Sequence, residues 1–172
     1  MFSGASRAVV RGSVALDNVL VYASAMNPTS ALSNLRFRVG RDEIAFRATS
    51  AALLAAEVWL PAGGGPPLLH RHAPEELYRV ERGELAIYLE DERGDVQRIE
   101  ARPGSVVHIP AGRAHTVRNE SGQEASAYVV FSPGAEMEAF LRAAGALAEP
   151  SVEEVLALAE RHGIEMAGPV PA

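Results

Sequence analysis

The residues best suited to chemistry in this chain begin with a pair of histidines and a glutamate. His70 and His72 lie two positions apart in the segment His70-Arg71-His72, and Glu76 follows shortly after. Side chains two apart on a β-strand point to the same face, so these two imidazoles form a pair of potential metal ligands. Glu76 begins the next predicted strand and can supply a carboxylate to the same centre.

A third histidine of this kind belongs to a separate predicted strand. His115 follows Pro110-Ala111-Gly112, whose proline and glycine favour a tight turn. Because this turn leads into an adjacent strand, the imidazole of His115 can join the same centre. Three neutral imidazoles and one carboxylate suit a divalent transition metal ion such as Fe, Mn, Ni, Co, Cu or Zn, and leave the complex a charge of about +1. A calcium ion would require more oxygen ligands.

Composition removes most other kinds of chemistry. The 172 residues include no Cys, and all 16 basic residues are Arg. Without Cys there are no disulfides, thiolate nucleophiles or Cys-ligated metals, and without Lys there is no residue for a Schiff base or a Walker-type phosphate loop. The formal net charge of −6 argues against a nucleic-acid partner or an anionic membrane surface, because both require a basic surface.

The start of the chain resembles a targeting segment only weakly. Arg7 and Arg11 precede an apolar run, but Asp17 and Asn18 interrupt it, which disfavours a secretory signal. No stretch approaches the roughly 20 apolar residues that cross a bilayer. We therefore expect a cytoplasmic protein.

Short strands fill the middle of the chain. Apolar and alternating runs predict strands over 35–39, 44–49, 53–60, 77–80, 84–90, 96–101, 106–109, 115–119 and 127–131. Many short strands separated by Gly- and Pro-rich turns are typical of an all-β sandwich or barrel. The absence of βαβ alternation disfavours a nucleotide-binding parallel sheet.

The end of the chain changes to helical periodicity. Ser132-Pro133 predicts an N-cap and a first-turn proline for one helix, and Ser151 with Glu154 predicts a capping box for a second, which Gly163 ends. The predicted apolar stripes are Met137, Phe140, Leu141 and Ala144 in the first helix, and Val152, Val155, Leu156 and Ala159 in the second. These stripes need an apolar surface to cover, and we expect the outside or the mouth of the barrel.

Together the histidine groups resemble the two signature motifs of the cupin superfamily. The motifs read Gly64…His70-X-His72…Glu76…Gly83 and, twenty residues further on, Gly104…Pro110-X-Gly112…His115…Asn119. The resemblance covers roughly residues 37–131. It implies a double-stranded β-helix, or jelly-roll, barrel in which His70, His72, Glu76 and His115 hold one divalent metal ion.

This resemblance organises the chain into three parts. We predict an N-terminal arm at 1–33, an all-β cupin barrel at 34–132 and a C-terminal extension of two α-helices at 133–172. Residues 1–25 either belong to the arm or precede a start at Met26. Phe131-Ser132-Pro133-Gly134 followed by an amphipathic helix also resembles bacterial monocupins of the quercetin-dioxygenase-like type.

The resemblance implies three candidate functions. The first is a metal-dependent dioxygenase-type oxidoreductase that acts on a small hydroxylated or enolisable molecule, aromatic ones included, with Glu76 as the catalytic base. The second is a metal-dependent isomerase or lyase of a sugar or keto acid, and the third is a non-enzymatic small-molecule binder. Cupins pair through exposed sheet faces and exchanged terminal strands, so the resemblance also implies a homodimer, with residues 1–30 as a candidate exchanged arm.

Several residues near the motifs have competing interpretations. Glu75 is a rival ligand, but the spacing to Gly83 favours Glu76. His108 is out of phase with the apolar residues beside it and is expected to face outward, as is Arg71. His162 is expected at a helix C-terminus. Four aromatic residues can line a pocket but are expected to pack in the core, namely Phe46, Trp59, Tyr78 and Phe131.

Overall fold

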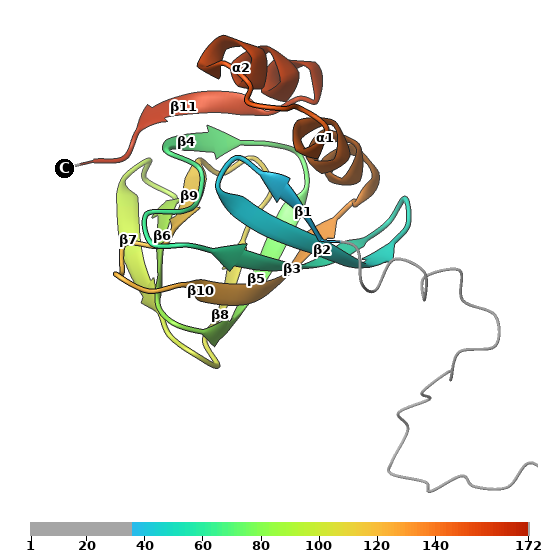
Figure 1. Cartoon of the computed structure of the whole chain (residues 1–172). Coiled ribbons are helices and arrows are strands. Elements are labelled where there is room, and N and C mark those ends of the chain that lie inside the picture. Colours follow the sequence, from blue (N-terminus) through green and yellow to red (C-terminus); the bar gives the residue numbers. More distant parts are fainter. Residues whose placement is uncertain (1–35, 172) are drawn as a thin grey trace, which may run out of the picture.

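Two antiparallel β-sheets face each other and form a barrel, with two helices at one end (Figure 1). The computed structural model describes residues 36–171. The elements are β1 (Arg36–Val39), β2 (Asp42–Thr49), β3 (Leu54–Leu60), β4 (Leu68–Arg71), β5 (Glu75–Arg82), β6 (Leu85–Glu90), β7 (Val96–Ala101), β8 (Val106–Ile109), β9 (His115–Arg118), β10 (Ala125–Ser132), α1 (Ala135–Gly145), α2 (Val152–Arg161) and β11 (Glu165–Pro169). The predicted arm at 1–33 lies outside the described residues.

The order of the strands confirms the all-β prediction. One sheet has six strands in the order β1-β2-β3-β10-β5-β8, and the other has five in the order β11-β4-β9-β6-β7. Neighbours in both sheets are often distant in sequence, as when β10 lies between β3 and β5. Such crossing between sheets is the jelly-roll arrangement of antiparallel strands.

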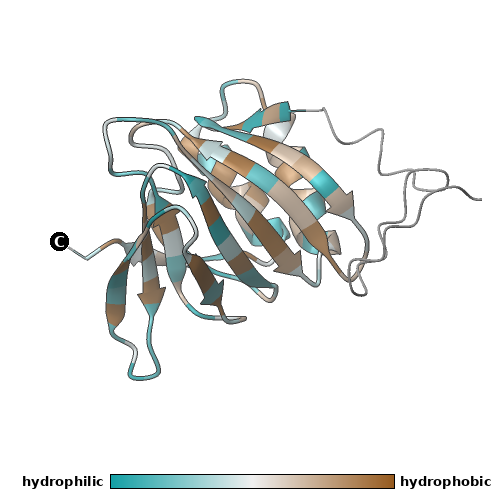
Figure 2. Ribbon diagram, turned by 90° about the horizontal axis from the view of Figure 1, so that it is seen from below, coloured by the Kyte–Doolittle hydropathy of each residue, from teal (hydrophilic) through white to brown (hydrophobic). Residues whose placement is uncertain are grey.

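The core lies between the sheets and follows the two-residue period of the strands. Apolar and polar residues alternate along some strands (Figure 2), and β5 buries alternate residues, whereas β3 and β6 contain runs of consecutive buried residues. Phe46 and Phe131 belong to this core, as predicted. Trp59 is buried on the outer side instead, where the guanidinium carbon of Arg36 lies 3.8 Å from its ring centroid.

Two strands of the five-stranded sheet are not predicted from the sequence. β4 is four residues long and follows two prolines, and β11 contains a glycine and ends in a proline. Neither has a clear alternating pattern, so both depend on their partners: β11 pairs with β4, and β4 pairs with β9. The C-terminal extension therefore returns to the barrel and covers an edge whose backbone groups would otherwise lack strand partners.

The first helix begins later than the sequence pattern predicts. Its N-cap is Gly134 and makes no side-chain hydrogen bond, so the predicted cap at Ser132-Pro133 is wrong. Ser132 instead ends β10, where it pairs with Glu75 of β5. Gly134 is required by packing, because a Cβ at this position would overlap with the backbone of Leu53. Met137, Leu141 and Ala144 are buried, as the predicted stripe requires.

The second helix confirms its predicted cap but not its predicted buried face. Ser151 and Glu154 form a reciprocal capping box. Its buried residues are Leu158 and Ala159, whereas three members of the predicted stripe are exposed, namely Val152, Val155 and Leu156. Within residues 36–171 neither helix has the length and apolar character needed to cross a membrane, and the cytoplasmic location stays a prediction.

Candidate metal centre

The three predicted histidines meet on the inner side of the five-stranded sheet. His70 of β4 is paired directly with His115 of β9, and His72 follows the end of β4. Potential ligand atoms of the three rings all lie within 4.8 Å of one another. The centroids of the His70 and His115 rings are 4.6 Å apart, and those of His72 and His115 are 5.0 Å apart.

Glu76 approaches this cluster from the opposite sheet. Its Oε1 atom lies 2.8 Å from Nε2 of His72 and 3.4 Å from Nε2 of His115, and its side chain is almost fully buried. Glu75, the rival carboxylate, faces outward and lies 2.9 Å from Nε2 of His108. The centre therefore joins both sheets, and the carboxylate beside the imidazoles is that of Glu76.

Backbone contacts between the two motifs fix the loops that present these side chains. The N–H of Gly112, whose φ of +72° suits glycine, donates to the carbonyl of His72 at 2.9 Å. Gly64 and Asn119 are joined by a bond from the Asn119 N–H to the Gly64 carbonyl at 3.0 Å. The buried Asn119 amide also donates to the carbonyl of Leu60. These motif positions build the frame of the site, and the contact of Gly112 with His72 is made through the backbone.

In each imidazole, a hydrogen bond from Nδ1 leaves Nε2 as the nitrogen that faces the centre. All three Nδ1 atoms lie within hydrogen-bond distance of a backbone carbonyl two residues away in sequence. The pairs are His70 with Leu68 at 3.2 Å, His72 with Pro74 at 2.9 Å and His115 with Arg113 at 2.9 Å. A carbonyl only accepts, so each Nδ1 carries the proton and donates it. In their neutral form the rings would present the lone pair of Nε2, which is how many metal-binding histidines are oriented.

Several polar atoms at the centre have no partner of their own. Among residues 36–171, Nε2 of His72, Nε2 of His115 and Oε2 of Glu76 are buried without a hydrogen-bond partner. A buried polar atom left unpaired costs roughly 1–3 kcal/mol, so this arrangement calls for a compensating charge. Lone pairs that converge in this way fit a divalent cation, and we conclude that the residues present are suited to a metal ion.

The charges of these groups support the same conclusion. Burial, and then the neighbouring His115, lowers the pKa of His70 to about 4. Burial alone would raise the pKa of Glu76, but the imidazoles of His115 and His72 outweigh it and hold the pKa well below its usual range. At neutral pH the centre thus contains an ionised carboxylate and a neutral His70 ring, which are the protonation states that metal ligands require. Burial alone would lower the pKa of His115, but its contact with Glu76 outweighs burial and raises that pKa.

Tyr78 belongs to the surroundings of the centre, although the sequence favours a core role for it. It occupies the next inward position of β5 after Glu76, and it packs against the core cluster. Burial, and then the charge of Glu76, raises the pKa of Tyr78 well above its usual range. The spacing of two residues on one strand is the signal that places Tyr78 on the same face as Glu76.

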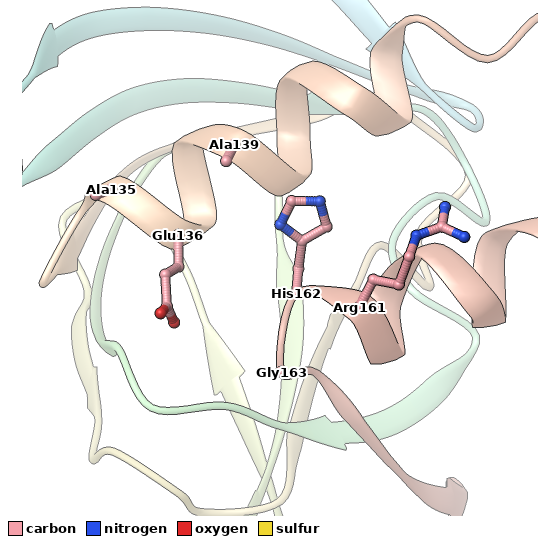
Figure 3. Close-up of a pocket in the computed structure, with 6 residues that line it drawn as sticks. All are labelled: Ala135, Glu136, Ala139, Arg161, His162 and Gly163. Atoms are coloured by element: carbon pink, nitrogen blue, oxygen red, sulfur yellow. The ribbon is translucent and has the colours of Figure 1, made fainter.

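The other histidines and Arg71 lie apart from the centre, as predicted. His108 is exposed, and the Arg71 guanidinium lies 4.0 Å from the carboxylate of Glu90. His162 is the C-cap of α2, and its ring packs against Phe140 with centroids 5.9 Å apart. It also lines a cleft between α1 and α2, shown in Figure 3, together with Ala135, Glu136, Ala139, Arg161 and Gly163.

Fold and site together define a small jelly-roll barrel with an inward-facing cluster of side chains that could hold a metal ion. Residues 56–131 match the sequence model of the family described as "Cupin domain". The matched residues include strands β4 to β9 and all four predicted ligands. This part of the chain is a cupin domain.

Curated relatives resemble only part of this chain. It is 30% identical to "Auxin-binding protein 1" of Arabidopsis thaliana over 82 residues, which are 44% of this chain and 41% of that protein. It is 36% identical to "Auxin-binding protein T92" of Nicotiana tabacum over 75 residues, 40% of each chain. The chain thus spans about two fifths of the length of the curated relatives it matches.

Solved structures share the fold. The protein TT1209 of Thermus thermophilus has a TM-score of 0.50 and 24% identity, with 63% of this chain and 96% of that chain covered. An RmlC-like cupin of Shewanella frigidimarina has a TM-score of 0.51 and 18% identity, with 60% and 87% covered. At these identities the likeness concerns the barrel alone.

Proposed function

We propose that His70, His72, Glu76 and His115 bind one divalent transition metal ion, and that the chain is a metal-dependent enzyme of the dioxygenase type. Its substrate would be a small hydroxylated or enolisable molecule. The observation that carries this proposal is the convergence of three imidazoles in the barrel, with the Glu76 carboxylate beside two of them. Nε2 of His72, Nε2 of His115 and Oε2 of Glu76 are buried without a hydrogen-bond partner among the described residues. The predicted resemblance to quercetin-dioxygenase-like cupins supports the choice of reaction and stays a prediction.

The chain's own residues would prepare this centre in distinct ways. The backbone carbonyls that accept from Nδ1 hold the rings in orientation, and burial keeps His70 neutral. A bound ion would supply a Lewis acid and a route for electrons. Glu76 would be both a ligand and the catalytic base, receiving a substrate proton on Oε2, the carboxylate oxygen that has no hydrogen-bond partner among the described residues.

Oxygen consumption by the metal-loaded chain tests the proposed reaction. Elemental analysis of protein purified without added metal should first find about one first-row ion per chain. An oxygen electrode would then screen flavonols, β-diketones and phenolic acids, and uptake that depends on one of them supports the proposal. Metal binding with no uptake on any substrate contradicts the dioxygenase reaction. Product formation under anaerobic conditions would instead support the isomerase or lyase.

A non-enzymatic binding function is the second candidate. It is favoured by the names of the two curated relatives, which refer to a ligand that they bind and to no reaction. The same barrel and metal centre would then hold a small molecule without converting it. Saturable binding in equilibrium dialysis, followed by recovery of the unchanged ligand, would support this candidate over the enzyme.

A homodimer remains our proposal for the partner of the barrel. Leu77 of β5 and Val106 of β8 are exposed apolar residues on the outer side of the six-stranded sheet. A second copy seated on this face would cover them. Sedimentation equilibrium of the full chain should give twice the monomer mass, and Leu77→Glu should lower it to the monomer value. A monomeric wild-type chain would contradict the proposal.

A further inference from the structure

The C-terminal strand places a methionine beside the first of the predicted ligands. β11 pairs with β4 in an antiparallel register that sets Met166 opposite His70. His70 is in turn opposite His115 of β9. Residues directly opposite on antiparallel strands have their side chains on the same face and their Cβ atoms about 5 Å apart. Met166 therefore continues the row of side chains that forms the metal centre.

The alternation of neighbouring residues supports the same orientation. Ile164, two residues before Met166, belongs to the core inside the barrel. Ala167, the next residue, packs with Leu69 in a separate cluster on the outer side of the sheet. A bulge after Met166 separates the two registers of β11 against β4. Met166 thus faces inward, on the side of Ile164 and His70.

The exposure of Met166 distinguishes it from the rest of this inner face. Met166 is 36% exposed, whereas Ile164 is 6% exposed. An apolar side chain that points toward the barrel interior and still meets solvent lies at the rim of the barrel. It is therefore the apolar surface that a molecule approaching His70 from this edge would contact.

We propose that Met166 is a specificity-determining residue, which contacts the apolar part of a small anionic ligand whose charged oxygen is directed at the histidine cluster. This inference rests on the proposed metal centre. A centre of about +1 charge favours carboxylates, phenolates and enolates, and the flexible, polarisable thioether adapts to aromatic or aliphatic groups. Ligands with an apolar body should therefore be preferred over ligands of the same charge without one.

Two carboxylates that differ only in their apolar part test this inference. The chain is loaded with Co²⁺, and its visible absorption is followed while acetate or benzoate is added. We expect the wild-type chain to bind benzoate more tightly than acetate. Met166→Gln should weaken benzoate binding about fivefold, as expected for partial loss of an apolar contact, and should change acetate binding less than about twofold.

Control variants separate this effect from a disturbed strand. Met166→Leu keeps an apolar side chain of similar size and should retain the preference for benzoate. Val152→Gln makes a similar apolar-to-polar change at an exposed position of α2 and should leave both affinities unchanged. Equal loss of both anions in Met166→Gln, or an unchanged preference for benzoate in a variant that still binds Co²⁺, would overturn the inference. So would wild-type Co²⁺ protein that responds to neither anion.

The proposed function fails in a different way. A wild-type chain that takes up no Co²⁺, measured by elemental analysis before any anion is added, removes the metal centre and this inference with it. Normal Co²⁺ uptake with no effect of Met166→Gln removes only the inference.

Discussion

Two adjacent glutamates on β5 form contacts with histidine that have similar lengths but different surroundings. Glu75 lies 2.9 Å from His108 on the outside of the barrel, and both side chains are about half exposed, at 52% and 54%. Glu76 lies 2.8 Å from His72 on the inside, where the side chains are 3% and 1% exposed. The distance alone therefore does not distinguish a surface pair from a candidate metal centre.

The difference lies in what surrounds each pair. Water solvates the outer carboxylate and imidazole, so their attraction is screened and contributes at most about 1 kcal/mol. The inner pair is shielded from water and has polar atoms without partners among residues 36–171. Burial of such atoms is costly unless something compensates them. The inner pair is thus suited to a cation, and the outer pair indicates an ordinary surface contact.

Among these predictions, removal of an inner imidazole should have the largest effect, and the quantity it changes is metal affinity. His72→Ala and His115→Ala each delete one of the converging Nε2 atoms, and we expect metal affinity to fall at least tenfold. Competition with a coloured chelator measures this loss, and far-UV circular dichroism shows whether the barrel persists. His108→Ala is the matched control and should bind metal as the wild-type chain does. Equal affinities in the inner and outer variants would contradict the comparison.

Metal removal should reduce stability through the same inner atoms. Binding that favours the folded state stabilises it by about 2.7 kcal/mol when the free ion is at 100 times its dissociation constant. Treatment with EDTA followed by thermal unfolding should therefore lower Tm, and restoring the ion should recover it. His115→Ala should show a much smaller change on the same treatment. If EDTA shifts the Tm of the variant as much as that of the wild type, the ion does not bind at His115.

The two glutamates provide the sharpest comparison on one strand. Glu76→Gln keeps an oxygen ligand but loses the negative charge, so it should retain more metal than His72→Ala and lose catalytic activity. Glu75→Gln should change neither quantity. Metal content and substrate-dependent oxygen uptake are measured on the same samples. An active Glu76→Gln variant would show that this carboxylate is not the base.

A substitution in the outer pair of Glu75 and His108 should have the smallest effect, which is on the free energy of unfolding. Because His108 and Glu75 are exposed and screened, Glu75→Gln should change the free energy of unfolding by less than about 0.5 kcal/mol. Chemical denaturation at low and high salt measures this change. A loss of several kcal/mol would mean that the outer contact is more than a surface ion pair.

The sequence predicts the centre of the molecule better than its C-terminal part. The grouping of His70 with His72 and the turn that precedes His115 can be recognised from local spacing and turn chemistry, although His72 lies just beyond the end of β4. The distinction between Glu75 and Glu76 is also local, because neighbouring residues on a strand face opposite sides. The motif spacing therefore identified the carboxylate that lies beside the histidines, and its role as a ligand stays a prediction.

Features that depend on distant partners were not predictable in this way. β4 and β11 have weak patterns of their own and exist through pairing with each other and with β9. The position of Met166 beside His70 follows from that pairing, and no local signal marks it. Likewise, the helical period identifies an apolar stripe on α2, but only the packing decides that Leu158 is buried while Val152 stays exposed.

X-ray absorption spectroscopy of the metal-loaded chain is the most direct test of the proposed metal centre, because it reports the ligands of the ion. With Zn²⁺ bound, we predict a first shell of nitrogen and oxygen at about 2.0–2.2 Å with the outer-shell scattering of three imidazoles. The same spectrum of His115→Ala should show one imidazole fewer. A wild-type spectrum with fewer than three imidazoles, or one that His115→Ala leaves unchanged, would show that the three histidines do not bind the ion together.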